Sequence, residues 1–403
     1  MLDEFDIDGI IREHARFEPE SGTYPAACEA VLSAADMDDA WAEITTWPGY
    51  APTPLRGLSN LSRELRVDEI LYKDEGRRFG LGSFKALGGA YAVLRVVAEE
   101  IAAKTGSQPS LADIRNGTCA ADAAGVTVTT ATDGNHGRSV AWGAQMAGAA
   151  CRIYIHAEVS EGRKAAMEAF GAEVIRVDGD YDESLRQCVG DAAANGWKIV
   201  SDTSFEGYMD VPRHVMAGYG VFAREIYKVI RERPPTHVFI QAGVGGVAAS
   251  LLASFWQLLG ERRPRFIIVE PARAACVLES AKRNAPSNVS IEEETIMAGL
   301  SCGEISLIAW EVLSRGASDV LSIGEHGVEE SMRLLASGKA GGGKLVAGES
   351  AVAGLVALIA AAKQGDWRMK LGIDNRSRIL LIGCEGATDP EIYEKIVGAP
   401  APG

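Results

Sequence analysis

A lysine in a glycine-rich segment is the first candidate for chemistry. Lys85 lies within Gly82-Ser-Phe-Lys-Ala-Leu-Gly-Gly-Ala90, at the start of an apolar helix pattern. Burial at this position disfavours an ammonium ion, and so does the positive end of the helix dipole. Because the neutral amine is the form that attacks a carbonyl carbon, the position favours Schiff-base chemistry. The alternative is an ordinary exposed lysine in a first helical turn.

A second polar loop, Thr132-Asp-Gly-Asn-His-Gly137, follows an apolar strand pattern and precedes a helix pattern. Open α/β sheets bind ligands at the carboxyl ends of their strands, so Asp133 and Asn135 are candidate ligand contacts. Both residue types also cap helices, and that purely structural role stays open. His136 receives no catalytic role, since a histidine in such a turn is commonly structural.

A third loop, Gly243-Val-Gly-Gly-Val-Ala248, lies between a strand pattern and a helix pattern. Its glycines let backbone N–H groups approach an anion at the helix N-terminus, which predicts a phosphate site. The same residues fit G-x-G-x-x-A, and Glu270 ends the next strand at the spacing of a dinucleotide fingerprint. A nicotinamide-dependent dehydrogenase is therefore a rival reading, and a tight turn without a ligand is a third.

The segment 338–344 nearly matches a P-loop. Leu345 stands where that motif has the serine or threonine that holds magnesium, and a helix pattern precedes it in place of a strand. We therefore predict a flexible glycine-rich loop and no nucleotide site there.

Strand and helix patterns alternate along the chain, which predicts an α/β fold with two domains of mostly parallel, twisted sheets flanked by helices. We expect a large cofactor-binding domain from 1–86 and 213–398, a small domain from 87–212, and a disordered tail at 399–403. The predicted strands are 70–72, 126–132, 151–155, 173–177, 198–201, 237–241, 266–269 and 378–382. The predicted helices are 85–103, 137–147, 162–170, 182–195, 212–231, 248–259 and 272–282.

Composition excludes several classes of protein. The net charge of the 403 residues is -15 and no basic stripe is present, so nucleic acid is not expected as a partner. The apolar run 351–362 is shorter than a membrane span, and the acidic N-terminus does not resemble a signal peptide, so we expect a cytoplasmic protein. The seven cysteines lack metal-ligand spacing, so no metal site is predicted, and most should be reduced.

The combination of these loops resembles a known family. S-F-K-A-L-G-G (83–89), D-G-N-H-G (133–137) and the glycine turn are similar to pyridoxal-phosphate enzymes of the tryptophan synthase β fold (fold type II), which include serine and threonine dehydratases. The resemblance runs from about Tyr72 to Asp389. Other segments resemble diaminopropionate ammonia-lyases, and Asp133 stands where ordinary dehydratases carry serine or glycine. These segments are 132–138, 201–208, 211–219, 298–304 and 384–393.

The resemblance implies pyridoxal 5'-phosphate in a cleft between the domains. It implies α,β-elimination of ammonia from D- and L-2,3-diaminopropionate, giving pyruvate and two molecules of ammonia. Lys85 would hold the cofactor and serve as the base on one face, with Asp133 as the base on the other. Asp202 would meet the second amine of the substrate, unless it is only a cap. Alternatives are a serine or threonine dehydratase, a related β-elimination or racemase on the same fold, and a non-catalytic relative.

The resemblance also implies the cofactor contacts and the partners. We expect a small amino-acid substrate and a homodimer. Cys276 and Cys302 are either a redox-sensitive pair or two separate thiols. Thr388 is an alternative to Cys384 as the partner of the pyridine nitrogen, and Glu349 is expected to flank the ring. The remaining contacts are Phe84, Lys85, Asn135 at the ring hydroxyl, and Gly243, Val244, Gly245 and Gly246 at the phosphate.

Overall fold

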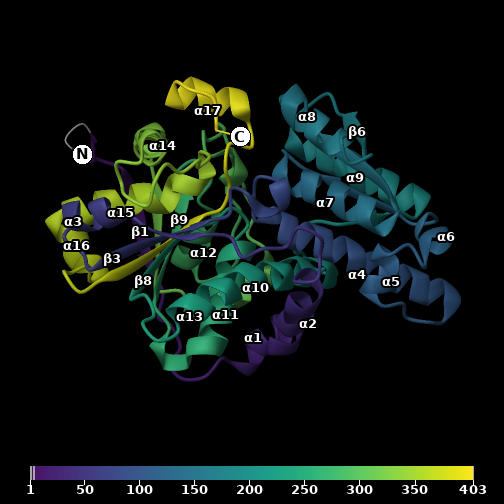
Figure 1. The fold of residues 1–403 in the computed structure, drawn as a ribbon, viewed down its shortest axis with the longest axis horizontal. Helices are drawn as coiled ribbons and strands as arrows, with labels where there is room; N and C mark the ends of the chain where they lie inside the picture. Colours follow the sequence, from purple (N-terminus) through teal and green to yellow (C-terminus); the bar gives the residue numbers. More distant parts are fainter. Residues whose placement is uncertain (1, 3–4, 403) are drawn as a thin grey trace. The chain divides into compact units, whose positions relative to one another are not determined.

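The computed structural model describes residues 2 and 5–402, which divide into two compact units (Figure 1). The larger unit comprises Met1–Ala34, Pro52–Ser83 and Phe222–Gly403, and the smaller comprises Ala35–Ala51 and Phe84–Val221. The chain therefore passes between the units at 34/35, 51/52, 83/84 and 221/222. Each unit is built around its own sheet.

Within the described residues, the larger unit contains a seven-stranded sheet in the order β1-β10-β9-β8-β11-β3-β2. Its inner strands are parallel, and the edge strands β1 and β2 pair antiparallel. Every residue of β8 and β10 is buried, as expected for parallel strands that are covered on both faces. The strands are β1 (Ile11–Arg16), β2 (Leu55–Gly57), β3 (Glu69–Asp74), β8 (His237–Gln241), β9 (Arg265–Pro271), β10 (Asp319–Ile323) and β11 (Arg378–Gly383).

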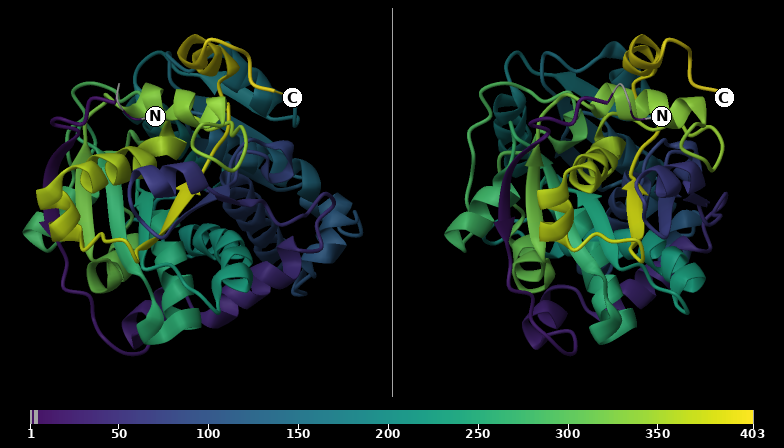
Figure 2. Two further views of the ribbon diagram at one scale, coloured as in Figure 1. Left: turned by 60° about the vertical axis from the view of Figure 1, so that its left-hand side comes forward. Right: turned by 90° about the vertical axis from the view of Figure 1, so that its left-hand side faces the viewer.

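The apolar helix α15 (Ala353–Lys363) lies against this sheet and contacts β8, β9, β10 and β11 (Figure 2). The other helices of the larger unit are α1 (Ala26–Val31), α3 (Ser59–Glu64), α11 (Gly246–Leu259), α12 (Cys276–Arg283), α13 (Leu307–Gly316), α14 (Val328–Ser337), α16 (Gly365–Leu371) and α17 (Pro390–Val397). Its 3₁₀ turns are η1 (Arg78–Gly80), η2 (Gly260–Arg262), η3 (Ala298–Leu300) and η4 (Ser350–Val352).

The smaller unit contains a parallel four-stranded sheet in the order β6-β5-β4-β7. Its helices α4 and α7 pack closely, and glycine at position 143 permits this approach. A Cβ at Gly143 would lie only 2.7 Å from the Cα of Ala90. The strands are β4 (Thr127–Ala131), β5 (Ala150–Ile155), β6 (Glu173–Arg176) and β7 (Lys198–Ile199). The helices are α2 (Ala34–Ile44), α4 (Lys85–Thr105), α5 (Leu111–Arg115), α6 (Ala120–Ala123), α7 (Asn135–Ala147), α8 (Glu161–Glu168) and α9 (Tyr181–Asn195), while α10 (Asp210–Ile230) belongs to both units.

The predicted α/β class with mostly parallel sheets is confirmed. The unit boundaries differ from the predicted domains, because residues 35–51 belong to the smaller unit and the units divide at 83/84 and 221/222. Side-chain contacts within the smaller unit account for the first difference. The Trp47 ring meets Trp142 of α7 edge-on, with centroids 5.5 Å apart. Glu43 of α2 forms a 2.5 Å ion pair with Arg115 of α5.

The helix expected at 272–282 begins only at Cys276, because β9 extends to Pro271 and a turn follows it. The segment 338–344 follows α14, so a helix precedes it as predicted. The carbonyl of Ala340 there accepts hydrogen bonds from the N–H groups of Asn60 and Leu61. Its expected flexibility stays a prediction. Residues 399–402 form no helix or strand, and Gly403 lies outside the described residues.

No helix in the described part of the chain has both the length and the hydrophobicity needed to cross a membrane.

Candidate active site

The Nζ of Lys85, the first residue of α4, donates a hydrogen bond to Oδ2 of Asp202 and forms an ion pair with it. Both side chains are about one-fifth exposed. Burial would raise the pKa of Asp202, but the positive charge of Lys85 more than offsets this, so the pKa lies well below its usual range. Lys85 is therefore not the isolated, exposed lysine of the alternative reading. Its amine is paired with a carboxylate in this structure, whereas the sequence favoured a neutral amine.

Asp202 is not needed as a cap. It follows β7, and in its turn the N–H of Thr203 donates to Oγ of Ser201 at 3.1 Å. The carboxylate of Asp202 faces Lys85 instead, together with the ring of His136, whose Nδ1 lies 3.9 Å from Oδ2. The structure thus brings together Lys85 and Asp202, two of the three predicted catalytic residues.

His136 is buried, and its Nε2 lies 2.8 Å from the carbonyl oxygen of Val200. Since a carbonyl only accepts, Nε2 carries the proton. Burial lowers the pKa of His136, partly opposed by the Asp202 charge, so the ring is neutral with an unprotonated Nδ1. This Nδ1 is buried and has no hydrogen-bond partner among the described residues. Such unpaired buried atoms are rare, and one beside Lys85 and Asp202 fits a site for a polar ligand.

The Asp133 carboxylate is not used to cap α7. The side chain of Thr132 takes that place, since its Oγ1 accepts from the N–H groups of Gly134 and Gly137, both at 3.1 Å. Oδ1 of Asp133 lies 3.2 Å from Nε2 of His156 but is too poorly aligned for a hydrogen bond. Asp133 therefore has a carboxylate available at the carboxyl end of β4. Asn135 is the first residue of α7 and is half-buried.

Tyr219 was not assigned a role from the sequence. Its ring packs edge-on against Phe84, with centroids 4.7 Å apart, and the Phe84 ring lies 5.6 Å from Nζ of Lys85. The Tyr219 hydroxyl is buried near Lys85 and makes no well-formed hydrogen bond in the part of the chain that is described. Burial raises the pKa of Tyr219, and the Lys85 charge opposes this rise. The signal available in the sequence was its place at the end of V-P-R-H-V-M-A-G-Y.

In the larger unit, the predicted glycine turn begins helix α11. Gly245 is the N-cap residue with φ 91°, and Gly246 is the first helical residue, so no side chain caps the helix. A Cβ at Gly243 would lie 2.8 Å from Sγ of Cys302, so a larger residue there would require a shift. The bare turn and the positive end of a 14-residue helix suit a phosphate group. Val244 lies in the same turn, and its carbonyl accepts from the N–H of Ser306.

Glu270 does not serve as the acidic residue of a dinucleotide fingerprint. It is fully buried, and its two carboxylate oxygens accept from the N–H groups of Val277 and Leu278, each at 2.8 Å. Burial raises the pKa of Glu270 to about 8, although the backbone hydrogen bonds oppose the rise. Its carboxylate is therefore engaged with the start of α12, which removes the feature that favoured a dehydrogenase.

Cys276 and Cys302 are separate thiols in the structure, and none of the seven cysteines, all of which lie within the described residues, is in a disulfide. Both flank Gly243, since Sγ of Cys276 donates to the Gly243 carbonyl at 3.6 Å.

Glu349 and Cys384 are buried, and Thr388 is half-buried. Two neighbours that the sequence did not single out connect these segments. Oε1 of Glu385 accepts from the N–H of Ser350, and Oγ of Ser350 accepts from the N–H of Gly299. Segments 298–300, 349–350 and 384–385 are thereby brought together. The family resemblance included 298–304 and 384–393, and Glu349 was expected to flank the ring, but the hydrogen bonds between these segments are long-range.

Three comparisons with known proteins bear on this arrangement. The sequence model of the family described as "Pyridoxal-phosphate dependent enzyme" matches residues 46–385. The diaminopropionate ammonia-lyase of Escherichia coli (strain K12) is 36% identical over 354 residues, covering 87% of this chain and 88% of the relative. A crystal structure of the Escherichia coli holo diaminopropionate ammonia-lyase matches with a TM-score of 0.86 and 34% identity over 97% of this chain and 98% of that one. A second crystal structure of that lyase, in complex with an aminoacrylate-PLP azomethine reaction intermediate, has a TM-score of 0.84 and 33% identity over 96% of each chain.

Proposed function

The chain belongs to the family of pyridoxal-phosphate-dependent enzymes, and on this basis we propose that it eliminates ammonia from D- and L-2,3-diaminopropionate. One water is consumed, and the products are pyruvate and two molecules of ammonia. The observation that carries the proposal is the ion pair of Lys85 with Asp202, together with a second carboxylate of the same unit, Asp133, whose place as a helix cap is taken by Thr132. A cationic diamine substrate requires a carboxylate partner, and a lyase that acts on both isomers requires a base on each face.

The residues present fit pyridoxal phosphate. In the smaller unit, Lys85 carries the amine that would hold the cofactor, and Asn135 is proposed to meet the ring hydroxyl. The unpaired Nδ1 of His136 is a buried polar atom that a bound ligand would satisfy, and the Tyr219 hydroxyl near Lys85 is a second candidate contact. In the larger unit, the uncapped turn at Gly243–Gly246 would bind the phosphate through backbone N–H groups. Phe84, Glu349, and Cys384 or Thr388 remain the proposed ring contacts.

When bound, pyridoxal phosphate supplies an electron sink for the charge that develops at Cα of the substrate. Lys85 Nζ and the Asp133 carboxylate are the proposed acceptors of the Cα proton. The contacts of Thr132 support the role of Asp133 as a base. Because the Thr132 side chain caps α7, the Asp133 carboxylate is not needed as the cap. His156 lies next to this carboxylate, with its Nε2 3.2 Å from Oδ1 of Asp133.

Asp202 is proposed to hold the β-ammonium of the substrate. Its lowered pKa keeps it ionised at neutral pH, and it already binds the ammonium group of Lys85. A carboxylate partner favours the protonated form of the β-amine. A protonated amine leaves Cβ as neutral ammonia, whereas an unprotonated amine would have to leave as an amide anion. Asp202 would therefore select the diamine and also maintain its good leaving group.

We also propose that the chain acts as a homodimer in the cytoplasm. The homodimer rests on the family resemblance, whereas the cytoplasmic location is the expectation from the sequence patterns. Light scattering of the purified protein tests the first, and cell fractionation tests the second.

The proposed activity is tested by incubating the holoenzyme with D- and L-diaminopropionate, serine and threonine and measuring the keto acid formed. We expect both isomers of the diamine to be the preferred substrates. Faster turnover of serine or threonine would identify a dehydratase. The absence of pyruvate from either diamine isomer, with cofactor bound, would refute the proposal.

A further inference from the structure

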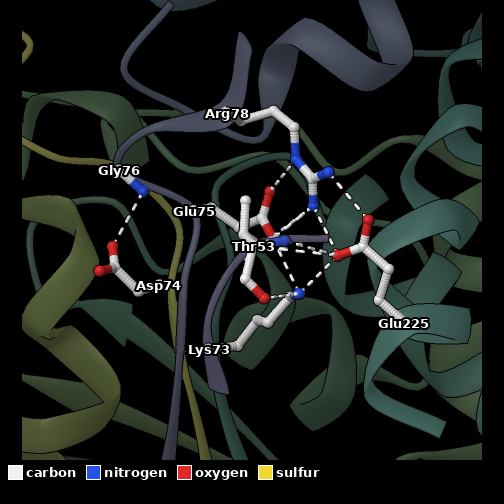
Figure 3. Close-up of polar contacts among 7 residues, drawn as sticks. All are labelled: Thr53, Lys73, Asp74, Glu75, Gly76, Arg78 and Glu225. Atoms are coloured by element: carbon white, nitrogen blue, oxygen red, sulfur yellow. Dashed lines mark hydrogen bonds and ion pairs between the residues drawn. The ribbon is translucent and has the colours of Figure 1, made fainter. Parts of the chain in front are cut away.

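A network of buried charges lies in the larger unit, apart from the residues considered above (Figure 3). Lys73, Glu75, Arg78 and Glu225 are each at most 5% exposed, and their charges balance. The guanidinium of Arg78 makes two hydrogen bonds of 2.8 Å to each carboxylate, which gives bidentate contacts with Glu75 and with Glu225. Nζ of Lys73 lies 2.5 Å from Oε2 of Glu225 and donates to the carbonyl of Thr53 at 2.8 Å.

Arg78 and Glu225 are held in their charged forms inside the protein. Burial would lower the pKa of Arg78, but the charge of Glu75 and the hydrogen bonds that Arg78 donates to Glu225 raise it overall. Burial would raise the pKa of Glu225, but its contacts with Arg78 lower it. Buried ion pairs contribute little net stability, because desolvation offsets much of the attraction, whereas they specify geometry closely. The network is therefore better explained by what it positions than by stability.

The network joins three segments beside passages between the two units. Thr53 follows the passage at 51/52, Arg78 precedes that at 83/84, and Glu225 follows that at 221/222. Thr53 is bound through its backbone, since its N–H donates to Oε2 of Glu225 at 3.2 Å. Its Oγ1 also donates to Oε1 of Glu75 and accepts from Nη2 of Arg78 at 3.0 Å. Arg78 thus ties the segment ahead of Lys85 to both of the other segments.

The backbone between Arg78 and Lys85 is in a conformation that needs such support. Phe79 has φ 52°, in the left-handed region that non-glycine residues rarely adopt, and Gly80 and Gly82 have φ 74° and 82°. The far end of the segment is also fixed within the larger unit, because the N–H of Gly386 donates to the Gly82 carbonyl at 2.9 Å. Lys85 is the second residue after Ser83, so the path of this segment limits where its amine can lie.

We propose that the Arg78–Glu75–Glu225 network positions Lys85 by holding residues 79–83 in their strained path. Arg78, Glu75 and Glu225 are positioning residues in this proposal, and they act through the backbone without touching cofactor or substrate. The inference deepens the proposed function and rests on it where catalysis is concerned. Its first test does not require the cofactor.

The experiment compares Glu225→Gln with a matched control, Asp319→Asn. Asp319 is a fully buried carboxylate of the same unit, bonded to His14 at 2.9 Å and Arg265 at 2.6 Å, away from the segment ahead of Lys85. Hydrogen exchange is measured on the cofactor-free proteins at a temperature where both are folded. We expect exchange across 79–84 to be faster by about tenfold or more in Glu225→Gln and unchanged in Asp319→Asn.

The second readout uses the holoenzymes. We expect Glu225→Gln to shift the visible band of the lysine-bound cofactor and to lower kcat about 10- to 100-fold with little change in KM, since misplacement of a reacting group acts on kcat. Asp319→Asn should retain the wild-type band and kcat. If Glu225→Gln does not fold, Thr53→Val removes the bridging hydroxyl more mildly, and Arg78→Lys keeps the charge but not the bidentate bonds.

Equal exchange across 79–84 in Glu225→Gln and wild type would overturn the inference, as would an unaltered cofactor band and kcat. A wild-type cofactor band in Arg78→Lys would show that a positive charge at residue 78 suffices without bidentate hydrogen bonds. That result would also contradict the inference. Failure of the proposed function gives a different result from failure of this inference. If the proposed function is wrong, the wild-type protein lacks the cofactor band or makes no pyruvate, but the difference in hydrogen exchange between Glu225→Gln and wild type persists.

Discussion

Lys85 and Asp202 form an ion pair that joins the first turn of α4 to the loop after β7. Asp202 thus binds a primary ammonium group in the structure, and a primary ammonium is also what the β-carbon of diaminopropionate carries. When Lys85 is engaged with the cofactor, we expect the substrate to take its place at Asp202. The following predictions depend on this exchange and on the groups around it.

Asp202→Asn should lower kcat/KM for diaminopropionate about 10- to 100-fold, because the asparagine oxygen can still accept a hydrogen bond but lacks the negative charge that pairs with the β-ammonium group. Turnover of serine, which has no second amine, should fall less. The control is Asp191→Asn, which alters another carboxylate of the smaller unit, bonded to the Tyr154 hydroxyl at 2.5 Å. A parallel loss of both activities in Asp202→Asn would argue against a role in binding the diamine.

Asp133→Asn should lower the rate of pyruvate formation from D-diaminopropionate by about 10²- to 10⁴-fold, which is the range for loss of a general base. Activity on the L-isomer should persist, because Lys85 serves the other face. Initial rates of pyruvate formation from each isomer measure this. Retention of D-isomer activity would contradict the two-base proposal.

Tyr219→Phe should have opposite effects on stability and function. The hydroxyl is buried near Lys85 without a well-formed hydrogen bond among the described residues, so its removal should leave the Tm of the cofactor-free protein unchanged or raised. If the hydroxyl meets the bound ligand, kcat/KM should fall about tenfold. Tyr154→Phe is the contrast, because it breaks the bond to Asp191 and should lower Tm. Full activity in Tyr219→Phe would show that the Tyr219 hydroxyl does not contact the bound ligand.

The raised pKa of Glu270 predicts a pH dependence of stability. An unfolded glutamate has a pKa of about 4.3, whereas burial raises that of Glu270 to about 8. Between these values the folded state binds the extra proton, so its contribution is present below about pH 4.3 and is lost as the pH rises towards 8. Thermal unfolding of wild type and Glu270→Gln from pH 5 to 8 should show a steeper loss of Tm in the wild type. Parallel curves would show that Glu270 is ionised throughout.

Much of the fold follows from local sequence patterns. The eight predicted strands all correspond to observed strands, because buried parallel strands are short apolar runs between turns. Among the described strands, the edge strands β1 and β2 and the buried inner strand β10 (Asp319–Ile323) were not predicted. The β1 sequence IREHAR alternates charged and apolar residues too weakly to indicate a strand. The assignment of residues 35–51 to the smaller unit depends on contacts such as Trp47 with Trp142, which no local pattern encodes.

The candidate site was predictable where one loop carries the signal. The Lys85 segment, the Asp133 loop and the glycine turn each begin a helix as expected. The sequence could not show that Thr132 replaces Asp133 as the cap, because the choice depends on side-chain geometry. Glu270 is the reverse case. Its spacing fits a dinucleotide fingerprint, but its burial against the start of α12 assigns it a structural role.

Attachment of the cofactor to Lys85 is the central claim, and borohydride reduction of the holoenzyme followed by peptide mass analysis tests it most directly. We expect the reduced cofactor on the peptide that contains Lys85, and loss of the visible band in Lys85→Arg. The buried Lys73, which is held by Glu225, should carry no label and serves as an internal control. A label on any lysine other than Lys85, or no label on a protein that shows the visible band, would contradict the claim.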